Sequence, residues 1–351
     1  MTGEGMNKVR IDLYSDTHTQ PGPAMRQAIA SAEVGDEQHG TDPTTNRLQD
    51  MVGELLGKPA ALFLPSGTMC NQIAYRIWCQ PGDEIIADVT AHTIHSETGG
   101  PAAVAGAMMR TVDGARGIFT ADHVEAAIRP EKRNVPRSAL VSVENTSNFG
   151  GGTVWPVETL RGIYQRSREM GIKCHMDGAR LLNAVIESGV SAADYAATQD
   201  SLWIDLSKGL GCPVGAVLAG DSDFIERAFR LKHLLGGAMR QSGILAAAGV
   251  YALENNVVRL AQDHDNARHL AGHLREIPGI RLDPETVETN LVFFDVADCP
   301  YTAPEIISRL SAYGILMGAR DDTRMRAVTH LDITREMVDE AADVLDDILR
   351  Q

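Results

Sequence analysis

The sequence predicts an α/β fold in which helices cover both faces of a mainly parallel sheet, followed by a smaller α+β domain. Helical patterns and short apolar runs alternate from about residue 44 to residue 220, which is typical of strand–helix units. Beyond residue 250, a long polar-rich helical pattern precedes two further strand–helix pairs. We therefore expect a docking segment over residues 1–20, a large domain over residues 21–249 and a small α+β domain over residues 250–351.

The large domain is expected to begin with an amphipathic helix and to continue through six buried strands. Asp42 is placed to cap that helix, Pro43 suits its first turn and Gly57 can end it. Its apolar stripe has helical spacing and consists of Leu48, Met51, Val52, Leu55 and Leu56. Short apolar runs without polar alternation are typical of strands covered on both faces. These runs are Ala60–Leu64, Glu84–Ala87, Ala139–Val143, Ile172–Met176, Leu202–Leu206 and Gly215–Leu218.

The small domain is expected to alternate helices with strands. Helices are predicted at Val250–Arg275, Ala303–Tyr313 and Thr334–Leu349, and strands at Leu291–Val296 and Arg326–His330. The opening strand at Ile11–Tyr14 is too short to be stable alone, so it must pair with another part of the chain.

Composition excludes several classes of protein. The 351 residues are 44% hydrophobic and 23% charged, which suits a globular protein and not a disordered or fibrous one. The net charge of −15, without a basic patch, argues against binding to nucleic acid. The apolar runs fall far short of the roughly 20 residues that cross a bilayer. The five cysteines lack a paired framework and no secretory signal is visible, so we expect a cytoplasmic protein that binds no membrane.

The segment after the first buried strand is a candidate anion site. Ser66, Gly67 and Thr68 open a helix, where free backbone N–H groups and two hydroxyls can surround a phosphate. An ordinary capped helix start explains the same tripeptide, so this signal is weak alone.

Two later strand ends carry charged residues that burial alone would not select. Asp177 follows an apolar run, and a carboxylate there needs a positive partner, which could be a ligand or simply Arg180. Lys208 lies between a strand and a glycine-rich loop, where partial burial would favour a nucleophilic amine; a lysine that extends from the loop into solvent is the simpler alternative. Together with the anion site, these residues supply what pyridoxal phosphate needs: partners for its phosphate, its pyridine nitrogen and its aldehyde.

Six motifs carry a family resemblance. They are Ser15-Asp16-Thr17, His39-Gly40-Thr41-Asp42, Ser66-Gly67-Thr68, His175-Met176-Asp177-Gly178-Ala179-Arg180, Ser207-Lys208-Gly209-Leu210-Gly211 and Met239-Arg240-Gln241. In order and spacing they closely resemble the low-specificity L-threonine aldolases, which are pyridoxal-phosphate enzymes of fold type I. The resemblance runs from residue 11 through the segment that begins at Arg326.

The resemblance implies roles for individual residues. Lys208 would form the Schiff base with pyridoxal phosphate, Asp177 would pair with the pyridine nitrogen and His92 would stack on the ring. The phosphate ligands would be Ser66, Gly67, Thr68 and Arg240, with Arg240 supplied by a neighbouring subunit of a dimer or tetramer. The substrate carboxylate would be held by Ser15, Arg180 and Arg326, with Arg180 also near the cofactor.

The implied reaction is a retro-aldol cleavage between Cα and Cβ. L-Threonine, L-allo-threonine or a related β-hydroxy-α-amino acid would give glycine and an aldehyde, with His92 or a water that it orders as the base at the β-hydroxyl. A β-eliminating lyase or an aminotransferase is the alternative within the same cofactor class, and a binding module that keeps this fold is the alternative outside it.

The chain departs from the family pattern around the expected substrate hydroxyl. Ser147 stands where the family commonly has histidine, and His39 stands where it often has tyrosine. Tyr14 and His233 also replace an arginine and a lysine of the pattern. We hypothesise that His39 or His95 contributes to hydroxyl recognition in place of the missing imidazole.

Metal binding is not expected. His269 and His273 are i, i+4 neighbours on a predicted helix and could bind an ion, but this spacing more often makes a solvated face.

Overall fold

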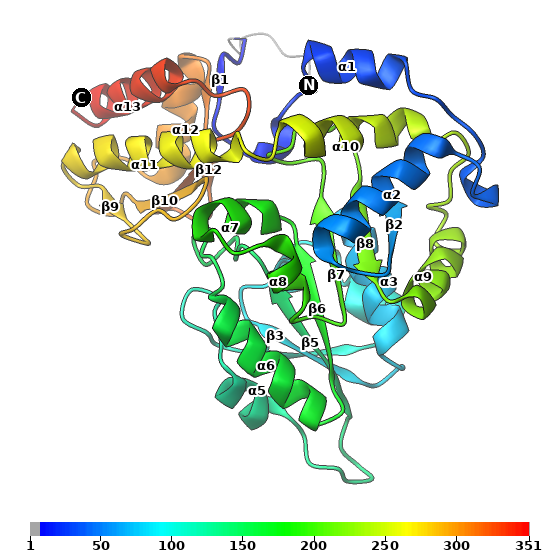
Figure 1. Ribbon diagram of the computed structural model, residues 1–351. Helices are drawn as coiled ribbons and strands as arrows, with labels where there is room; N and C mark the ends of the chain where they lie inside the picture. Colours follow the sequence, from blue (N-terminus) through cyan, green and yellow to red (C-terminus); the bar gives the residue numbers. More distant parts are fainter. Residues whose placement is uncertain (1–7, 351) are drawn as a thin grey trace. The chain divides into compact units, whose positions relative to one another are not determined.

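The computed structural model describes residues 8–350 (Figure 1). The chain forms two compact units: a large unit of residues 21–257, and a small unit of residues up to 20 together with those from 258 onward. The division lies after residue 257 and not at the expected residue 249. Helix α10 (Gly243–Asn255) runs across residue 249 and packs on α1 (Pro23–Ala30) and α2 (Pro43–Leu56), so it belongs to the large unit.

The large unit is built on a seven-stranded sheet. Its strand order is β2 (Ala60–Leu64), β8 (Ala216–Gly220), β7 (Ser201–Asp205), β6 (Lys173–Gly178), β5 (Ser138–Glu144), β3 (Glu84–Asp88) and β4 (Met108–Val112). Only β8 is reversed, since it pairs antiparallel with both β2 and β7. The predicted mainly parallel sheet is therefore confirmed, and all six predicted strands are present with small shifts at their ends.

One strand of the sheet was missed. Strand β4 lies at the edge, pairs only with β3 in the sheet order and leaves Met108 exposed. Because it includes Arg110 and Thr111, it lacks the continuous apolar run that identifies the central strands.

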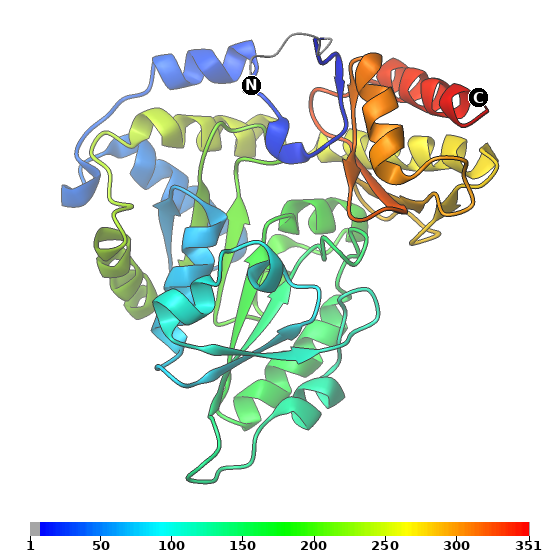
Figure 2. The same ribbon diagram turned by 180° about the vertical axis from the view of Figure 1, so that it is seen from behind.

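Helices cover both faces of the sheet. Helices α6 (Val157–Glu169) and α8 (Ala192–Ala196) lie in front of it in Figure 1, and α3 (Gly67–Trp78) lies in front of it in the reverse view of Figure 2. Helix α3 packs against α9 (Ser222–Leu234) over a core that includes Trp203. The remaining elements of this unit are a 3-10 turn at Glu37–His39, α4 (His92–His95), a π turn at Pro101–Ala105, α5 (Ala121–Ala127) and α7 (Leu181–Ser188).

The predicted capping of the first long helix is confirmed. The Asp42 carboxylate accepts a hydrogen bond of 2.9 Å from the Thr45 N–H at the start of α2, and Gly57 ends the helix with φ 60°. Leu48, Val52 and Leu56 of its apolar stripe are buried, Met51 is half-buried, and Leu55 is 37% exposed.

The small unit has a four-stranded antiparallel sheet in the order β12 (Gly318–Ala319), β13 (Arg324–Val328), β10 (Leu291–Asp295) and β9 (Arg281–Leu282). Its helices are α11 (Leu260–Glu276), α12 (Ala303–Ala312) and α13 (Arg335–Arg350), with a 3-10 turn at Asp16–His18. The short opening strand β1 (Ile11–Asp12) pairs in parallel with β11 (Ile315–Leu316).

The single helix expected at Val250–Arg275 is wrong. Helix α10 ends at Asn255 and α11 begins at Leu260. Asparagine is a poor helix former, and the Asn256 amide instead donates a hydrogen bond of 2.7 Å to the Leu210 carbonyl. Among the described residues, no helix combines the length and the apolar character that a membrane span requires.

Candidate active site

The chemistry-bearing residues of the large unit gather at the carboxyl ends of adjacent strands. Asp177 on β6 lies in register with Glu144 on β5 and with Trp203 on β7. Lys208 follows β7 after two residues, and helix α3 begins three residues after β2. In open α/β sheets, ligands bind at this edge, because the loops that follow the strands meet there.

Asp177 is a buried carboxylate, 5% exposed. One oxygen accepts a hydrogen bond of 2.9 Å from the Asn71 amide, and the other accepts one of 3.0 Å from the Ala179 N–H. Burial raises the pKa of Asp177, while the charges of Lys208 and His92 lower it in part. The carboxylate is therefore suited to a cationic N–H partner, which would restore its ionised form.

The Lys208 side chain does not extend into solvent as a loop lysine would. Its Nζ lies 3.0 Å from the Asp205 carboxylate and 5.9 Å from the centre of the Trp203 ring, and the side chain is 18% exposed. The amine is thus held at the sheet edge, on the same side as Asp177.

His92 and Glu97 form a dyad beside Asp177. His92 Nδ1 lies 3.0 Å from Glu97 Oε1, and the His92 backbone N–H donates to Glu144 at 2.6 Å. The hydrogen bond with Glu97 raises the pKa of His92 although burial opposes it. Because Glu97 takes the Nδ1 side of the ring, Nε2 is the nitrogen left for a ligand.

Asn71 links these groups and was missed by the sequence analysis. Its amide nitrogen donates to both Asp177 and Glu97, at 2.9 and 2.7 Å. Its oxygen accepts a hydrogen bond of 2.7 Å from the Trp203 indole and lies 3.1 Å from His175 Nε2. The only sequence signal was a polar residue on the apolar face of the helix that follows Ser66.

Glu97 and Glu144 were missed as well. Glu97 is 4% exposed, and its second oxygen accepts from Gln72 at 2.8 Å. Glu144 accepts from the Asn148 N–H at 2.8 Å, and burial raises its pKa to about 7. No pattern in the sequence separates these two buried acids from the many exposed ones.

The start of α3 is compatible with both interpretations of its sequence, an ordinary capped helix start and an anion site. The Ser66 hydroxyl caps the helix by accepting from the Met69 N–H at 3.3 Å, whereas Thr68 is exposed. A Cβ on Gly67 would lie 2.1 Å from the Trp203 ring, so no larger residue fits at this turn. The first-turn N–H groups remain suited to an anion.

Arg240 and His39 are brought together on the surface of the large unit. Asp36 accepts from Arg240 at 3.0 Å and lies 3.0 Å from His39 Nδ1. Both side chains are largely exposed. Among the described residues, no hydrogen bond or ion pair joins either of them to Lys208 or Asp177.

The other predicted residues of the large unit lie in two loops and a short helix. His95 shares α4 with His92, approaches the Val89 carbonyl at 2.8 Å and contacts the Phe149 ring edge to face. Ser147 is buried in a loop, and Arg180 follows β6, is 6% exposed and donates its N–H to Asn145 at 3.2 Å.

Ser15 and Arg326 belong to the small unit. The Ser15 hydroxyl accepts from the Thr17 N–H at 3.2 Å, and the Arg326 guanidinium donates to the Tyr14 carbonyl at 3.1 Å. The fold of this unit therefore brings Arg326 to the backbone of Tyr14, the residue before Ser15, although Arg326 and Ser15 are far apart in the chain.

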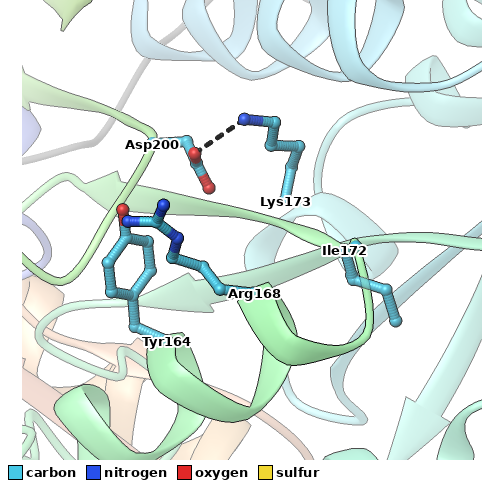
Figure 3. Close-up of a pocket in the computed structure, with 6 residues that line it drawn as sticks. Tyr164, Arg168, Ile172, Lys173 and Asp200 are labelled. Carbon is cyan, nitrogen blue, oxygen red and sulfur yellow. Dashed lines mark hydrogen bonds and ion pairs between the residues drawn. The ribbon is translucent and has the colours of Figure 1, made fainter.

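A cavity of about 210 Å³ lies elsewhere in the large unit (Figure 3). Its lining includes Tyr164, Arg168 and the ion pair of Lys173 with Asp200 at 2.9 Å. Lys173 begins β6 and Asp177 lies near its end, so the two sites are at opposite ends of the strand, roughly 13 Å apart at 3.3 Å per residue.

The residues at the sheet edge fit pyridoxal phosphate. The buried Asp177 carboxylate matches a pyridinium N–H, the restrained Lys208 amine matches an aldehyde, and the open N–H groups of α3 match a phosphate. His92 and Asp177 belong to one group of buried or half-buried side chains whose polar atoms lie within 4.8 Å of one another.

Comparison with protein families shows which family the chain is related to: the family model of the beta-eliminating lyases matches residues 12–298. The chain belongs to the beta-eliminating lyase family. Among the curated relatives, the low-specificity L-threonine aldolase of Escherichia coli strain K12 is 43% identical over 95% of this chain and 97% of its own length. Low-specificity L-threonine aldolase 1 of Arabidopsis thaliana is 40% identical over 92% of each chain.

Solved structures confirm the fold. A threonine aldolase from Leishmania major superposes with a TM-score of 0.83 at 24% identity, over 97% of this chain and all of its own. A serine palmitoyltransferase from Sphingomonas wittichii has a TM-score of 0.76 at 16% identity, over 99% of this chain and 92% of its own. The predicted fold of the type I pyridoxal-phosphate enzymes is therefore correct.

Proposed function

We propose that the protein is a pyridoxal-phosphate-dependent aldehyde-lyase that cleaves L-threonine, L-allo-threonine or a related β-hydroxy-α-amino acid to glycine and an aldehyde. The observation that carries this proposal is the meeting of Lys208, Asp177 and His92 at one sheet edge. The 43% identity to an L-threonine aldolase over nearly the whole chain favours this activity over β-elimination or amino transfer.

Lys208 and Asp177 would hold the cofactor from opposite sides of its ring. Lys208 would form the Schiff base, and Asp177 would keep a proton on the pyridine nitrogen. When bound, pyridoxal phosphate supplies an electron-poor ring that takes up the electron pair left at Cα. Asn71 would orient Asp177, because its amide nitrogen donates to that carboxylate while Trp203 fixes its oxygen.

His92 is the proposed base at the β-hydroxyl, directly or through a water. The acceptor on Nδ1 is Glu97, which fixes the ring and raises the pKa of His92, so Nε2 is a stronger base near neutral pH. As the Cα–Cβ bond breaks, the hydroxyl proton would pass to this nitrogen and the aldehyde would leave.

The remaining roles rest on the resemblance. We propose Arg180 as the ligand of the substrate carboxylate, while the same role for Ser15 and Arg326 stays a prediction from the resemblance alone. Ser66, Gly67 and Thr68 would bind the phosphate. Arg240 would complete the phosphate site of a neighbouring copy in a dimer or tetramer, and its exposure supports that assignment. The five unpaired cysteines are consistent with a cytoplasmic enzyme.

Product analysis tests the function. Incubation of the yellow holoenzyme with L-threonine, L-allo-threonine, phenylserine and hydroxyaspartate should release glycine and an aldehyde in equal amounts. Pyruvate with ammonia would instead indicate β-elimination, and an exchanged amino group would indicate an aminotransferase. A colourless protein that pyridoxal phosphate does not reconstitute would indicate a binding module.

His95 and His39 should differ in their effect on the substrate. His95 lies one turn from His92 on α4, whereas His39 is tied to Asp36 with Arg240. We expect His95→Ala to lower kcat/KM for threonine about tenfold, the usual scale for one lost hydrogen bond to substrate. We expect His39→Ala chiefly to weaken cofactor binding. Steady-state kinetics on threonine and phenylserine and cofactor titration measure both, and unchanged constants in both variants would refute any role of these histidines.

A further inference from the structure

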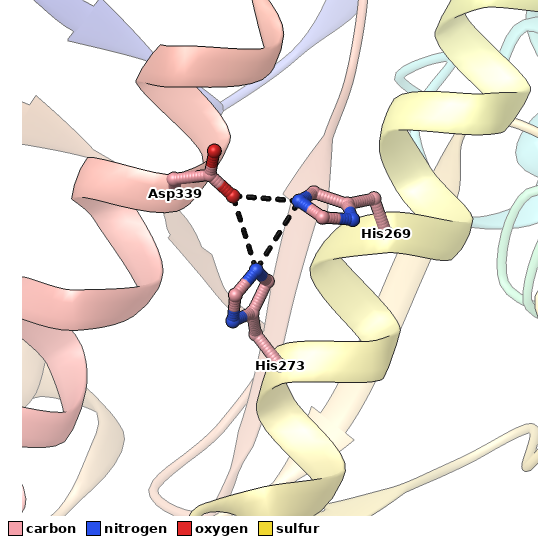
Figure 4. A group of neighbouring side chains, drawn as sticks. All are labelled: His269, His273 and Asp339. Atoms are coloured by element: carbon pink, nitrogen blue, oxygen red, sulfur yellow. Dashed lines mark hydrogen bonds and ion pairs between the residues drawn. The ribbon is translucent and has the colours of Figure 1, made fainter.

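Three ligand-type side chains converge between two helices of the small unit (Figure 4). His269 and His273 lie one turn apart on α11, and Asp339 faces them from α13. The sequence favoured a solvated face for these histidines, because nothing in it shows that a residue 66 positions beyond His273 completes the group.

The distances suit a shared ion. His269 Nε2 lies 2.6 Å and His273 Nε2 lies 3.0 Å from the same oxygen of Asp339. The two ring nitrogens are 3.2 Å apart, and their rings are perpendicular. A tetrahedral zinc ion with bonds of about 2.0–2.1 Å separates two nitrogen ligands by about 3.3 Å, close to this spacing.

The scaffold holds the ligands while leaving them accessible. The apolar faces of α11 and α13 are anchored in the core of the small unit by Leu270, Leu274, Val338 and Ala342. The three ligand side chains are each 35–44% exposed, so an ion and a water molecule can reach them.

We propose that His269, His273 and Asp339 bind one divalent late first-row transition-metal ion, such as Zn²⁺, and that the ion links α11 to α13. Imidazole with carboxylate is a ligand set for Zn²⁺, Co²⁺ or Ni²⁺, whereas Ca²⁺ and Mg²⁺ require more oxygen atoms. Three protein ligands leave a fourth position for water. The group lies wholly within the small unit and Lys208 lies in the large one, so the proposal does not depend on the proposed reaction.

Metal titration of the tag-free holoenzyme, stripped with a chelator, tests the site. Zn²⁺ should bind at one equivalent per chain by calorimetry, and Co²⁺ should give a visible absorption band. Saturation with Zn²⁺ should raise the melting temperature by a few degrees, because a ligand that binds only the folded state stabilises it. The variants His273→Gln and Asp339→Asn should each weaken Zn²⁺ binding at least tenfold and lose the thermal shift.

His18→Gln is the matched control. His18 pairs with Asp12 at 2.8 Å in the same unit, but among the described residues this pair belongs to no group of three converging ligand atoms, so the substitution should leave Zn²⁺ affinity unchanged. Circular dichroism of the metal-free variants checks that each one folds. The proposal is overturned if the protein binds no Zn²⁺ at 1:1 stoichiometry in the micromolar range, or if His273→Gln and Asp339→Asn bind it as tightly as the parent, which would assign the ion to the cofactor or another surface.

Discussion

Lys208→Ala is expected to remove the yellow colour and to lower kcat at least about 10³-fold. The amine at this position is the only group we propose to bond covalently to the cofactor, and loss of a covalent catalyst commonly costs a factor of this size or more. Absorbance of the purified protein, borohydride reduction followed by peptide mapping, and steady-state release of aldehyde measure the effect. Borohydride should label Lys208 in the parent protein.

Lys173→Ala is the matched control for this prediction. Lys173 begins β6, and its amine pairs with Asp200 at 2.9 Å, at the opposite end of the sheet from Asp177. This variant should keep its colour and its kcat. A Lys208→Ala protein that remains yellow and active, or a borohydride label on another lysine, would show that the covalent site has been wrongly assigned.

Asp177→Asn is expected to lower kcat by about 10²–10⁴-fold while the protein stays folded. The amide keeps the shape of the carboxylate and can still accept a hydrogen bond, but it carries no charge to stabilise a protonated pyridine nitrogen. Kinetics of aldehyde release measure the loss. Reconstitution with N-methylated pyridoxal phosphate, whose ring nitrogen carries a permanent positive charge, should recover part of the rate in the variant only.

Asp200→Asn provides the comparison for Asp177→Asn. Asp200 lies at the opposite end of the sheet, where it pairs with Lys173 and accepts from the Cys174 N–H at 2.9 Å. Its substitution should affect stability and leave kcat within about twofold. Equal losses in the two variants, or no rescue by the methylated cofactor, would mean that Asp177 acts through folding and not through the ring nitrogen.

The buried central strands were easier to predict than the edge strand of the sheet or the break between two helices. Buried strands such as Leu202–Leu206 and Ala60–Leu64 are continuous apolar runs, and hydrophobicity along the chain is a local property. Strand β4 was missed because an edge strand tolerates polar residues such as Arg110. The break between α10 and α11 was missed because it depends on a distant partner. The Asn256 side-chain amide donates a hydrogen bond to the carbonyl of Leu210, 46 positions earlier in the chain.

The candidate site was predicted in outline from residue type and position. A lysine and an aspartate that directly follow apolar strands are unusual, so Lys208 and Asp177 stood out without any knowledge of the fold. Asn71, Glu97 and Glu144 did not stand out, because their neighbours in the chain look like ordinary helix and loop residues. Their importance comes from partners up to 132 positions away, as in the bond between Asn71 and Trp203.

By itself, the sequence determined the class of fold and the cofactor class, and it pointed to the strand ends that form the candidate site. Periodic hydrophobicity, helix caps and turn residues depend only on residues a few positions apart in the chain, so they can be recognised from the sequence alone. Only the tertiary structure decided that Glu97 fixes His92, that Asn71 joins two buried carboxylates and that Asp339 meets His269 and His273. Those contacts depend on how whole helices pack against one another. Packing is decided by many weak contacts between side chains that are far apart in the chain, and no short segment of sequence contains both partners of such a contact.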